Sequence, residues 1–318
     1  MIGEDSLALK DRFTQLYHDL LISPADPMTL RELFESLLSL VRGGDDSPAV
    51  LSSVWKASLR TLTKLLAFPG LVAALRGDTQ LDADLLVRLF LEAKLDPVDH
   101  AEEEQKILLK QQTLLKIMEI LPVSQDAILT VFKAIVKEVK AKTVGDTDAI
   151  YSAQFGEGAK RNAGEAISIG VKREGVVELM VKVMCAKIRK QLKNLSTMEN
   201  KKATSNLKLK DYLCFLIKTL EDAIRKVPAE KLTPLILTLK HDLFEVICTG
   251  AECEDVLVRN QTQILFTYVL QQILSGDIPL REELEILLVK VVLKPTVTLA
   301  QQYHRRVGGP QQKTAPSS

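Results

Sequence analysis

The sequence has few aromatic residues and no long apolar run. Phe, Tyr and Trp make up 5% of the 318 residues, so aliphatic side chains must supply most of the core. The apolar stretches, such as residues 286–293 with Lys290 inside it, fall far short of the ~18 residues that a membrane span needs. Glu4 and Asp5 stand where a signal peptide needs apolar residues. We therefore expect no membrane span and a location in the cytoplasm or the nucleus.

Cysteine is also scarce, and its spacing fits neither a disulfide framework nor a zinc site. The four cysteines all lie in the second half of the chain, mostly within helical patterns, which favours buried and reduced thiols. His241, Cys248 and Cys253 come closest to a metal-binding group, but their spacings match no zinc pattern. The sequence predicts no metal site.

Nucleotide-binding and catalytic motifs are missing as well. After Gly156 and Gly158, a dinucleotide-binding motif would need a glycine where Arg161 stands. A phosphate-binding loop fails too, because the spacing from Gly158 to Gly164 is one residue too long and Glu165 follows. No nucleophile, base and orienting acid can be recognised together. We predict no catalytic residue and no cofactor, and expect a protein that is not an enzyme.

Amphipathic helical patterns fill most of the sequence. Apolar residues recur at spacings of three and four, and no sustained period-two pattern indicates a strand. Leu, Ala, Lys and Glu, which favour helices, are common. About eleven helices are predicted, over residues 6–22, 27–42, 49–68, 81–94, 101–121, 124–142, 176–195, 207–227, 229–249, 254–274 and 280–293. The predicted fold class is all-α.

A glycine-rich segment, residues 143–175, interrupts this pattern with six of the fifteen glycines. We interpret it as a flexible linker; the alternative is a binding or regulatory loop with Tyr151 and Ser152 as phosphorylation sites. It would separate an N-terminal acidic helical block, residues 1–142, from a C-terminal basic block, residues 176–295. Residues 296–318 have the composition of a disordered tail.

One helix pair resembles a HEAT repeat. In residues 231–274, Pro234 and Asp242 have the family's spacing in the first helix, and Val258 with Arg259 precedes the apolar positions of the second. Trp55 and Lys56 also resemble the opening of a tubulin-binding TOG repeat. Stacked antiparallel hairpins with a recurrence near ~40 residues are typical of this superfamily. The resemblance implies a right-handed α-solenoid of HEAT or armadillo type.

Charge is distributed unevenly along the chain, although the overall net charge is only +1. Residues 1–105 contain 18 acidic and 10 basic residues, which leaves a net charge of +9 for the remainder. Within the predicted helix 176–195, three cations share one face to within about 40° and a fourth lies about 60° further round. Either this is an ordinary solvated face or it binds an acidic partner. The candidate partner-binding residues are Lys182, Lys187, Arg189, Lys190 and Lys193.

These observations favour an interaction scaffold or adaptor subunit whose repeat surface binds acidic or extended segments of protein partners. The alternative is an electrostatic binder of nucleic acid or microtubules through the basic helix 176–195. Few aromatic residues accompany the cations, so recognition of specific single-stranded bases is not expected.

Overall fold

The structure is a computed structural model, and its described residues are almost entirely helical. It describes residues 27–42, 57–58, 61–62, 65–66, 69–77, 83–92, 100–144, 152–197, 203–276 and 278–293. These contain eleven α-helices and a short π-helix, and no strand. The predicted all-α class is therefore confirmed for this part of the chain. The predicted helix 6–22 and the tail 296–318 lie outside the described residues, as does most of the predicted helix 49–68.

The chain forms two compact units, residues 1–131 (unit 1) and residues 132–318 (unit 2). The division falls inside helix α7 (Gln125–Val144), whereas the sequence analysis placed a linker at residues 143–175 between two blocks. The predicted block boundaries thus differ from the observed ones.

Unit 1 contains α2 (Pro27–Arg42), α4 (Pro69–Gly77), α5 (Ala83–Glu92) and α6 (His100–Ile120). Helix α2 packs against α4, and α5 packs against α6. The Asp84 carboxylate accepts a hydrogen bond from the Ser124 amide at 2.8 Å, and the Ser124 hydroxyl accepts one from the Ala127 amide at 3.1 Å. Ser124 therefore caps α7, as its position in the sequence predicts.

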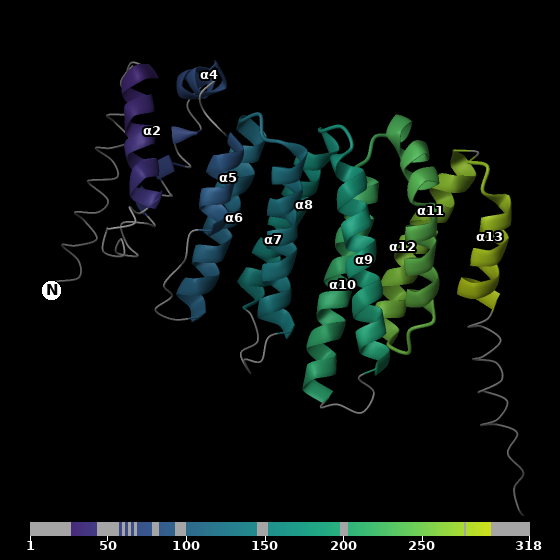
Figure 1. The fold of residues 1–318 in the computed structure, drawn as a ribbon. Coiled ribbons are helices and arrows are strands. Elements are labelled where there is room, and N and C mark those ends of the chain that lie inside the picture. The colour runs from purple at the N-terminus through teal and green to yellow at the C-terminus, as the bar shows by residue number, and fades with distance from the viewer. Residues whose placement is uncertain are drawn as a thin grey trace, which may run out of the picture. The chain divides into compact units, whose positions relative to one another are not determined.

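Unit 2 continues from the second half of α7 with six further α-helices. They are α8 (Ala153–Val171), α9 (Val176–Thr197), α10 (Ala203–Arg225), α11 (Ala229–Ala251), α12 (Val256–Ser275) and α13 (Arg281–Leu288), followed by the π-helix η1 (Val289–Leu293). The last two elements together cover the predicted final helix, residues 280–293. Figure 1 shows their succession in unit 2.

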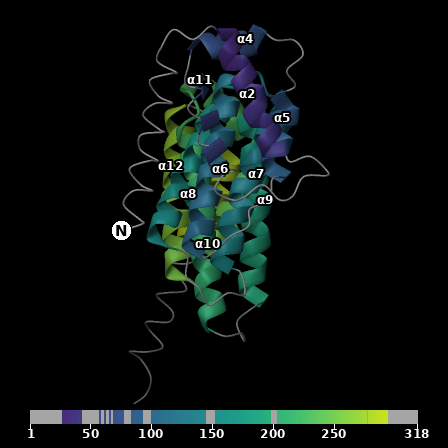
Figure 2. The same ribbon diagram turned by 90° about the vertical axis from the view of Figure 1, so that its left-hand side faces the viewer.

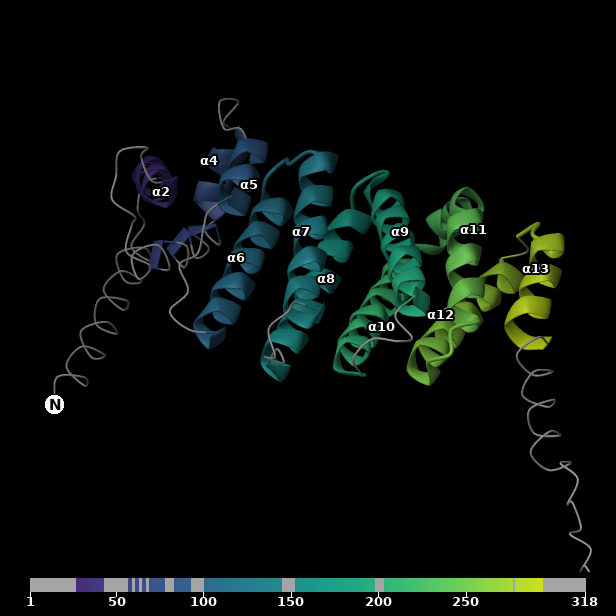
Figure 3. The same cartoon turned by 60° about the horizontal axis from the view of Figure 1, so that its bottom comes forward.

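Alternate helices of unit 2 lie in the same layer. Helix α10 packs against both α8 and α12, while α9 packs against α11. The hairpins α9–α10 and α11–α12 connect the two layers. Figure 3 shows α9 and α11 in one row with α10 and α12 in the other, and Figure 2 shows α9 on the opposite side from α8 and α12.

The glycine-rich segment is largely helical, which corrects the predicted linker over residues 143–175. Its residues 153–171 form α8, which Ser152 caps by accepting a hydrogen bond from the Phe155 amide at 3.0 Å. One face of α8 is buried and consists mainly of small residues; Phe155, Ala159, Ala163, Ala166 and Ile167 are each at most 1% exposed. Packing of this face outweighs the glycines' low helix propensity, which costs up to about 1 kcal/mol each relative to alanine.

Helix α10 supplies the centre of the unit 2 core. Leu213, Leu216, Ile217 and Leu220 are fully buried in it. Near their side chains, the Tyr212 hydroxyl donates a hydrogen bond of 3.4 Å to the Val136 carbonyl of α7. Because α10 contacts α8, α9 and α12, it holds both layers of unit 2 in place.

A buried carboxylate also joins α10 to α12. The Glu221 side chain is 2% exposed. It accepts hydrogen bonds from the side chains of Lys218 and Arg225 on its own helix and from the side-chain Nε2 of Gln261 on α12. Arg225 in turn lies over the Tyr268 ring of α12, with 4.1 Å between the guanidinium carbon and the ring centroid. The α10–α12 pair is therefore fixed by polar as well as apolar contacts.

Candidate functional site

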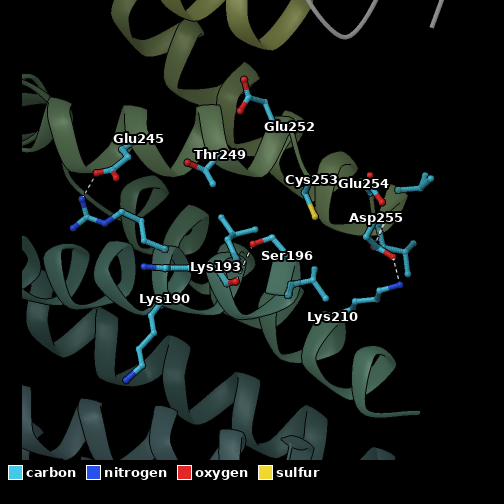
Figure 4. Close-up of a pocket in the computed structure, with 15 residues that line it drawn as sticks. Lys190, Lys193, Ser196, Lys210, Glu245, Thr249, Glu252, Cys253, Glu254 and Asp255 are labelled. Carbon is cyan, nitrogen blue, oxygen red and sulfur yellow. Dashed lines mark hydrogen bonds and ion pairs between the residues drawn. The ribbon is translucent and has the colours of Figure 1, made fainter. Parts of the chain in front are cut away.

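A concave site lies within unit 2, between the C-terminal half of α9 and the α11–α12 turn. We call it the α9–α11 groove, and its volume is about 1230 Å³. Helix α9 lines it with residues 189–190, 192–193 and 195–196; the opposite wall consists of Glu245, Thr249 and residues 252–257, with Lys210 contributed by α10. Figure 4 shows the two walls facing each other.

Arg189 bridges the two walls at one end of the groove. Its guanidinium forms ion pairs with two acids of α11, Asp242 at 2.8 Å and Glu245. The hydrogen bond with Glu245 raises the pKa of Arg189 despite partial burial. The guanidinium thus fastens α9 to α11, and its charge is largely neutralised by the two carboxylates.

A second bridge joins Lys210 to Asp255 at 2.8 Å. Asp255 also caps α12 by accepting hydrogen bonds from the Leu257 and Val258 amides at 3.0 and 3.1 Å. Burial alone would raise the pKa of Asp255, but the Lys210 hydrogen bond and the two amides outweigh it and lower this pKa. Arg259 completes the turn by donating to the carbonyls of Cys253 and Glu254 at 2.9 and 2.8 Å.

Asp255 should stabilise the groove through both its cap and its charge. We expect Asp255→Ala to lower the free energy of unfolding by about 1–2 kcal/mol, because it removes the cap and the ion pair. Asp255→Asn should cost less, because asparagine caps helices well and only the charge is lost. Denaturant unfolding of the full chain at pH 7 measures both values.

The difference in stability between the wild type and Asp255→Asn should also depend on pH. The folded pKa of Asp255 lies below its ordinary value, so its charge contributes stability above about pH 4 and loses that contribution as the pH falls through the folded pKa. The difference between the wild type and Asp255→Asn should therefore shrink in acid. A difference that stays constant down to about pH 2 would show that the charge contributes nothing.

Besides the ion pairs of Arg189 and Lys210, the groove has exposed apolar side chains and an exposed cation. Val256 and Leu257 are 56% and 57% exposed, although both are large apolar side chains. Lys193 on the facing helix is exposed to solvent. A ligand that combines apolar groups with a carboxylate is complementary to this surface.

The structure separates the five predicted partner-binding residues into three groups. Arg189, Lys190 and Lys193 line the groove, although the Lys190 side chain extends to the side of α9 away from Glu245 (Figure 4). Lys182 pairs with Glu178 of its own helix at 2.7 Å. Lys187 is half-buried and lies among lysines of α7 instead. Acids of the same protein therefore pair with two of the five cations, Lys182 and Arg189, and Lys187 does not line the groove.

Several groove residues have no counterpart in the sequence prediction. Glu245, Lys210 and Leu257 lie on three different helices, and only the packing of α9 against α11 and α10 brings them together. Among the groove residues, Asp255 carries a signal that the sequence alone contains, because an acidic residue directly before an apolar helical pattern is a recognisable N-cap. The periodicity of each helix does not show which other helices it packs against.

The cysteines and the metal-binding side chain types are the remaining candidates for chemistry among the described residues. The four cysteines are free. Burial raises the pKa of every one, to about 12 for Cys185 and about 11 for Cys214, so the thiols are neutral at pH 7. No cluster of three or more metal-binding side chains occurs in the part of the chain that the structure describes.

Comparisons of the chain with protein-family models, with curated proteins and with solved structures find no match. The resemblance of residues 231–274 to a HEAT repeat therefore remains a prediction. None of the described helices is both long and apolar enough to cross a membrane.

Proposed function

We propose that this protein is a non-enzymatic interaction scaffold in which unit 2 forms a HEAT- or armadillo-like α-solenoid. The layered packing of α8, α10 and α12 against α9 and α11 supports this proposal, because stacked hairpins place alternate helices in the same layer. Such an arrangement presents long surfaces between neighbouring hairpins, where segments of partner proteins bind.

The observation that carries the proposal is the α9–α11 groove. Its volume of about 1230 Å³ exceeds the ~300–1,000 Å³ of typical small-molecule pockets. Exposed Val256 and Leu257 give an apolar surface, and Lys193 gives a cation beside it. The partner is thus a protein segment with apolar side chains and a nearby acidic residue. The ion pairs of Arg189 and Lys210 hold the helices around the groove in a fixed geometry.

The test is a comparison of two substitutions on the same helix. Leu257→Glu places a charge in the groove, whereas Leu274→Glu makes the same change at a residue that is 66% exposed, about 25 Å further along α12 and outside the groove. Both positions are exposed, so both variants should fold. Partners captured by the full chain should be retained by Leu274→Glu and bind Leu257→Glu at least about tenfold more weakly.

The measurement is quantitative affinity purification, followed by calorimetric titration of the purified partner. Equal binding of a partner by both variants would exclude the groove as its site. If no partner distinguishes the wild-type chain from Leu257→Glu, the proposal is wrong.

A further inference from the structure

Five lysines from two helices of unit 2 form a second surface, which shares only Lys190 with the lining of the groove. Lys133, Lys137 and Lys140 lie at i, i+4 and i+7 in α7, which places them within about 60° of one another around the helix. Lys187 and Lys190 lie at i and i+3 in α9, also about 60° apart. We call these five residues the α7–α9 lysine cluster.

Lys187 is at the centre of the α7–α9 lysine cluster. Burial lowers its pKa, and the charges of Lys140, Lys133, Lys190 and Lys137 lower this pKa further. Three of these four lysines belong to α7 and one to α9, so the charges of both helices act on Lys187. The nearest acids in sequence, Glu138 and Glu178, lie at least about 100° away around their own helices.

Such a concentration of like charge is unfavourable in the free protein. Within the described residues, no ion pair or hydrogen bond is made by the side chains of these five lysines, in contrast to Arg189 and Lys210 nearby. Proteins normally intersperse charges of both signs on their surfaces, because like charges repel. An anionic ligand that neutralises several of the lysines at once would remove this repulsion.

The composition of the cluster indicates what kind of anion fits. It contains only lysine, whose ammonium acts as a point charge on a flexible stem, and no arginine to form a planar fork with a carboxylate. It also contains no aromatic side chain on which a base could stack. A phosphate monoester carries about −1.5 to −2 charge at pH 7, against −1 for a carboxylate, so clustered phosphates neutralise more lysines within the same small area.

We propose that the α7–α9 lysine cluster is a binding site for a compact anion that carries several phosphate groups. The anion is either a soluble polyphosphorylated molecule or the phosphorylated headgroup of a membrane lipid. This site shares only Lys190 with the α9–α11 groove, so substitutions at Lys133 and Lys137, which do not line the groove, test it separately from the proposed function.

Calorimetric titration of the full chain with inositol hexakisphosphate tests the site. The variant Lys133→Glu with Lys137→Glu changes two exposed residues of the cluster. Its matched control, Lys172→Glu with Lys231→Glu, makes the same change in charge at two exposed lysines of unit 2 outside the cluster. We expect the cluster variant to bind about tenfold more weakly or not at all, and the control to bind like the wild type. Lys133→Arg with Lys137→Arg should retain binding, because it keeps both charges.

Two further probes distinguish the sources of the phosphates. Vesicles of phosphatidylcholine that contain a bisphosphorylated phosphoinositide should compete with inositol hexakisphosphate if the ligand is a headgroup, and should fail to bind if it is soluble. Either result supports the site when the cluster variant abolishes the binding of inositol hexakisphosphate. Tighter binding of duplex DNA, duplex RNA or polyglutamate than of inositol hexakisphosphate would overturn the proposal, as would equal loss of binding in the control variant.

Discussion

Replacing Leu216 with alanine is expected to lower the free energy of unfolding by about 2–5 kcal/mol, the largest effect of any substitution considered. Leu216 is 0% exposed near the middle of α10, the helix that contacts α8, α9 and α12. Removal of its isobutyl group loses the transfer free energy of that group and leaves a cavity between packed helices. Denaturant unfolding of the full chain, followed by circular dichroism at the helical band, measures the loss.

Leu207 provides the control for this prediction. It lies on the same helix but is 57% exposed, so Leu207→Ala should change the free energy of unfolding by no more than about 0.5 kcal/mol. Equal effects of the two substitutions would mean that α10 is not the centre of the unit 2 core.

The second large effect is expected at Gly250, where α11 comes close to α12. A Cβ atom at this position would lie 2.4 Å from Oγ1 and 2.9 Å from Cγ2 of Thr262. Thr262 is fully buried, and its hydroxyl donates a hydrogen bond of 2.8 Å to the Val258 carbonyl, so it cannot turn away freely. Gly250→Ala should therefore cost about 1–3 kcal/mol through overpacking, although alanine favours helix.

A double substitution and a substitution at a second glycine test whether the contact with Thr262 causes the loss of stability. Thr262→Ala removes the two nearest of the three Thr262 atoms that Cβ would meet and leaves only Cβ at 3.2 Å, so it should recover much of the loss in a Gly250→Ala background. At Gly164 in α8 the nearest atom to a Cβ would be Lys226 Nζ at 3.4 Å, an ordinary contact at the end of a flexible side chain. Gly164→Ala should thus stabilise the protein by up to about 1 kcal/mol. Destabilisation of similar size at both glycines would contradict the argument.

The sequence predicts individual helices well where a polar cap precedes an apolar pattern. Ser124 and Asp255 each cap a helix of the structure, and Pro228, which lacks a capping side chain, stands directly before a third. These signals are local, because a cap needs only the three residues that follow it. The predicted helices therefore agree with α7, α11 and α12 to within about two residues at most ends.

The helix α8 was missed because its apolar face consists of small side chains. Alanines at positions 159, 163 and 166 follow the helical spacing set by Phe155 and Ile167, but alanine and glycine bury too little surface to form a clear apolar stripe. The six glycines of residues 143–175 instead favour a linker. Ser152 before Phe155 is the signal that would have identified the helix.

The candidate site could be predicted only in part, for a different reason. Arg189 and Lys193 could be recognised as exposed cations on one helix face, but the acids that neutralise Arg189 are more than fifty positions away in the sequence. Helical periodicity says which residues share a face and leaves open which helix that face meets. For the same reason, nothing in the sequence of α7 alone connects Lys137 with Lys187.

Helix α9 makes contacts on three sides, which should limit the substitutions that it tolerates. One side is buried at Met180, Met184 and Ile188, the next is fastened to α11 through Arg189, and a third faces the lysines of α7 through Lys187. An ordinary surface helix alternates between sensitive and permissive positions with a period of about 3.6 residues. In a saturation mutagenesis scan scored for both folding and ligand binding, α9 should lose most of that alternation, with permissive positions confined to the N-terminal half of the exposed side, around Glu178 and Lys182.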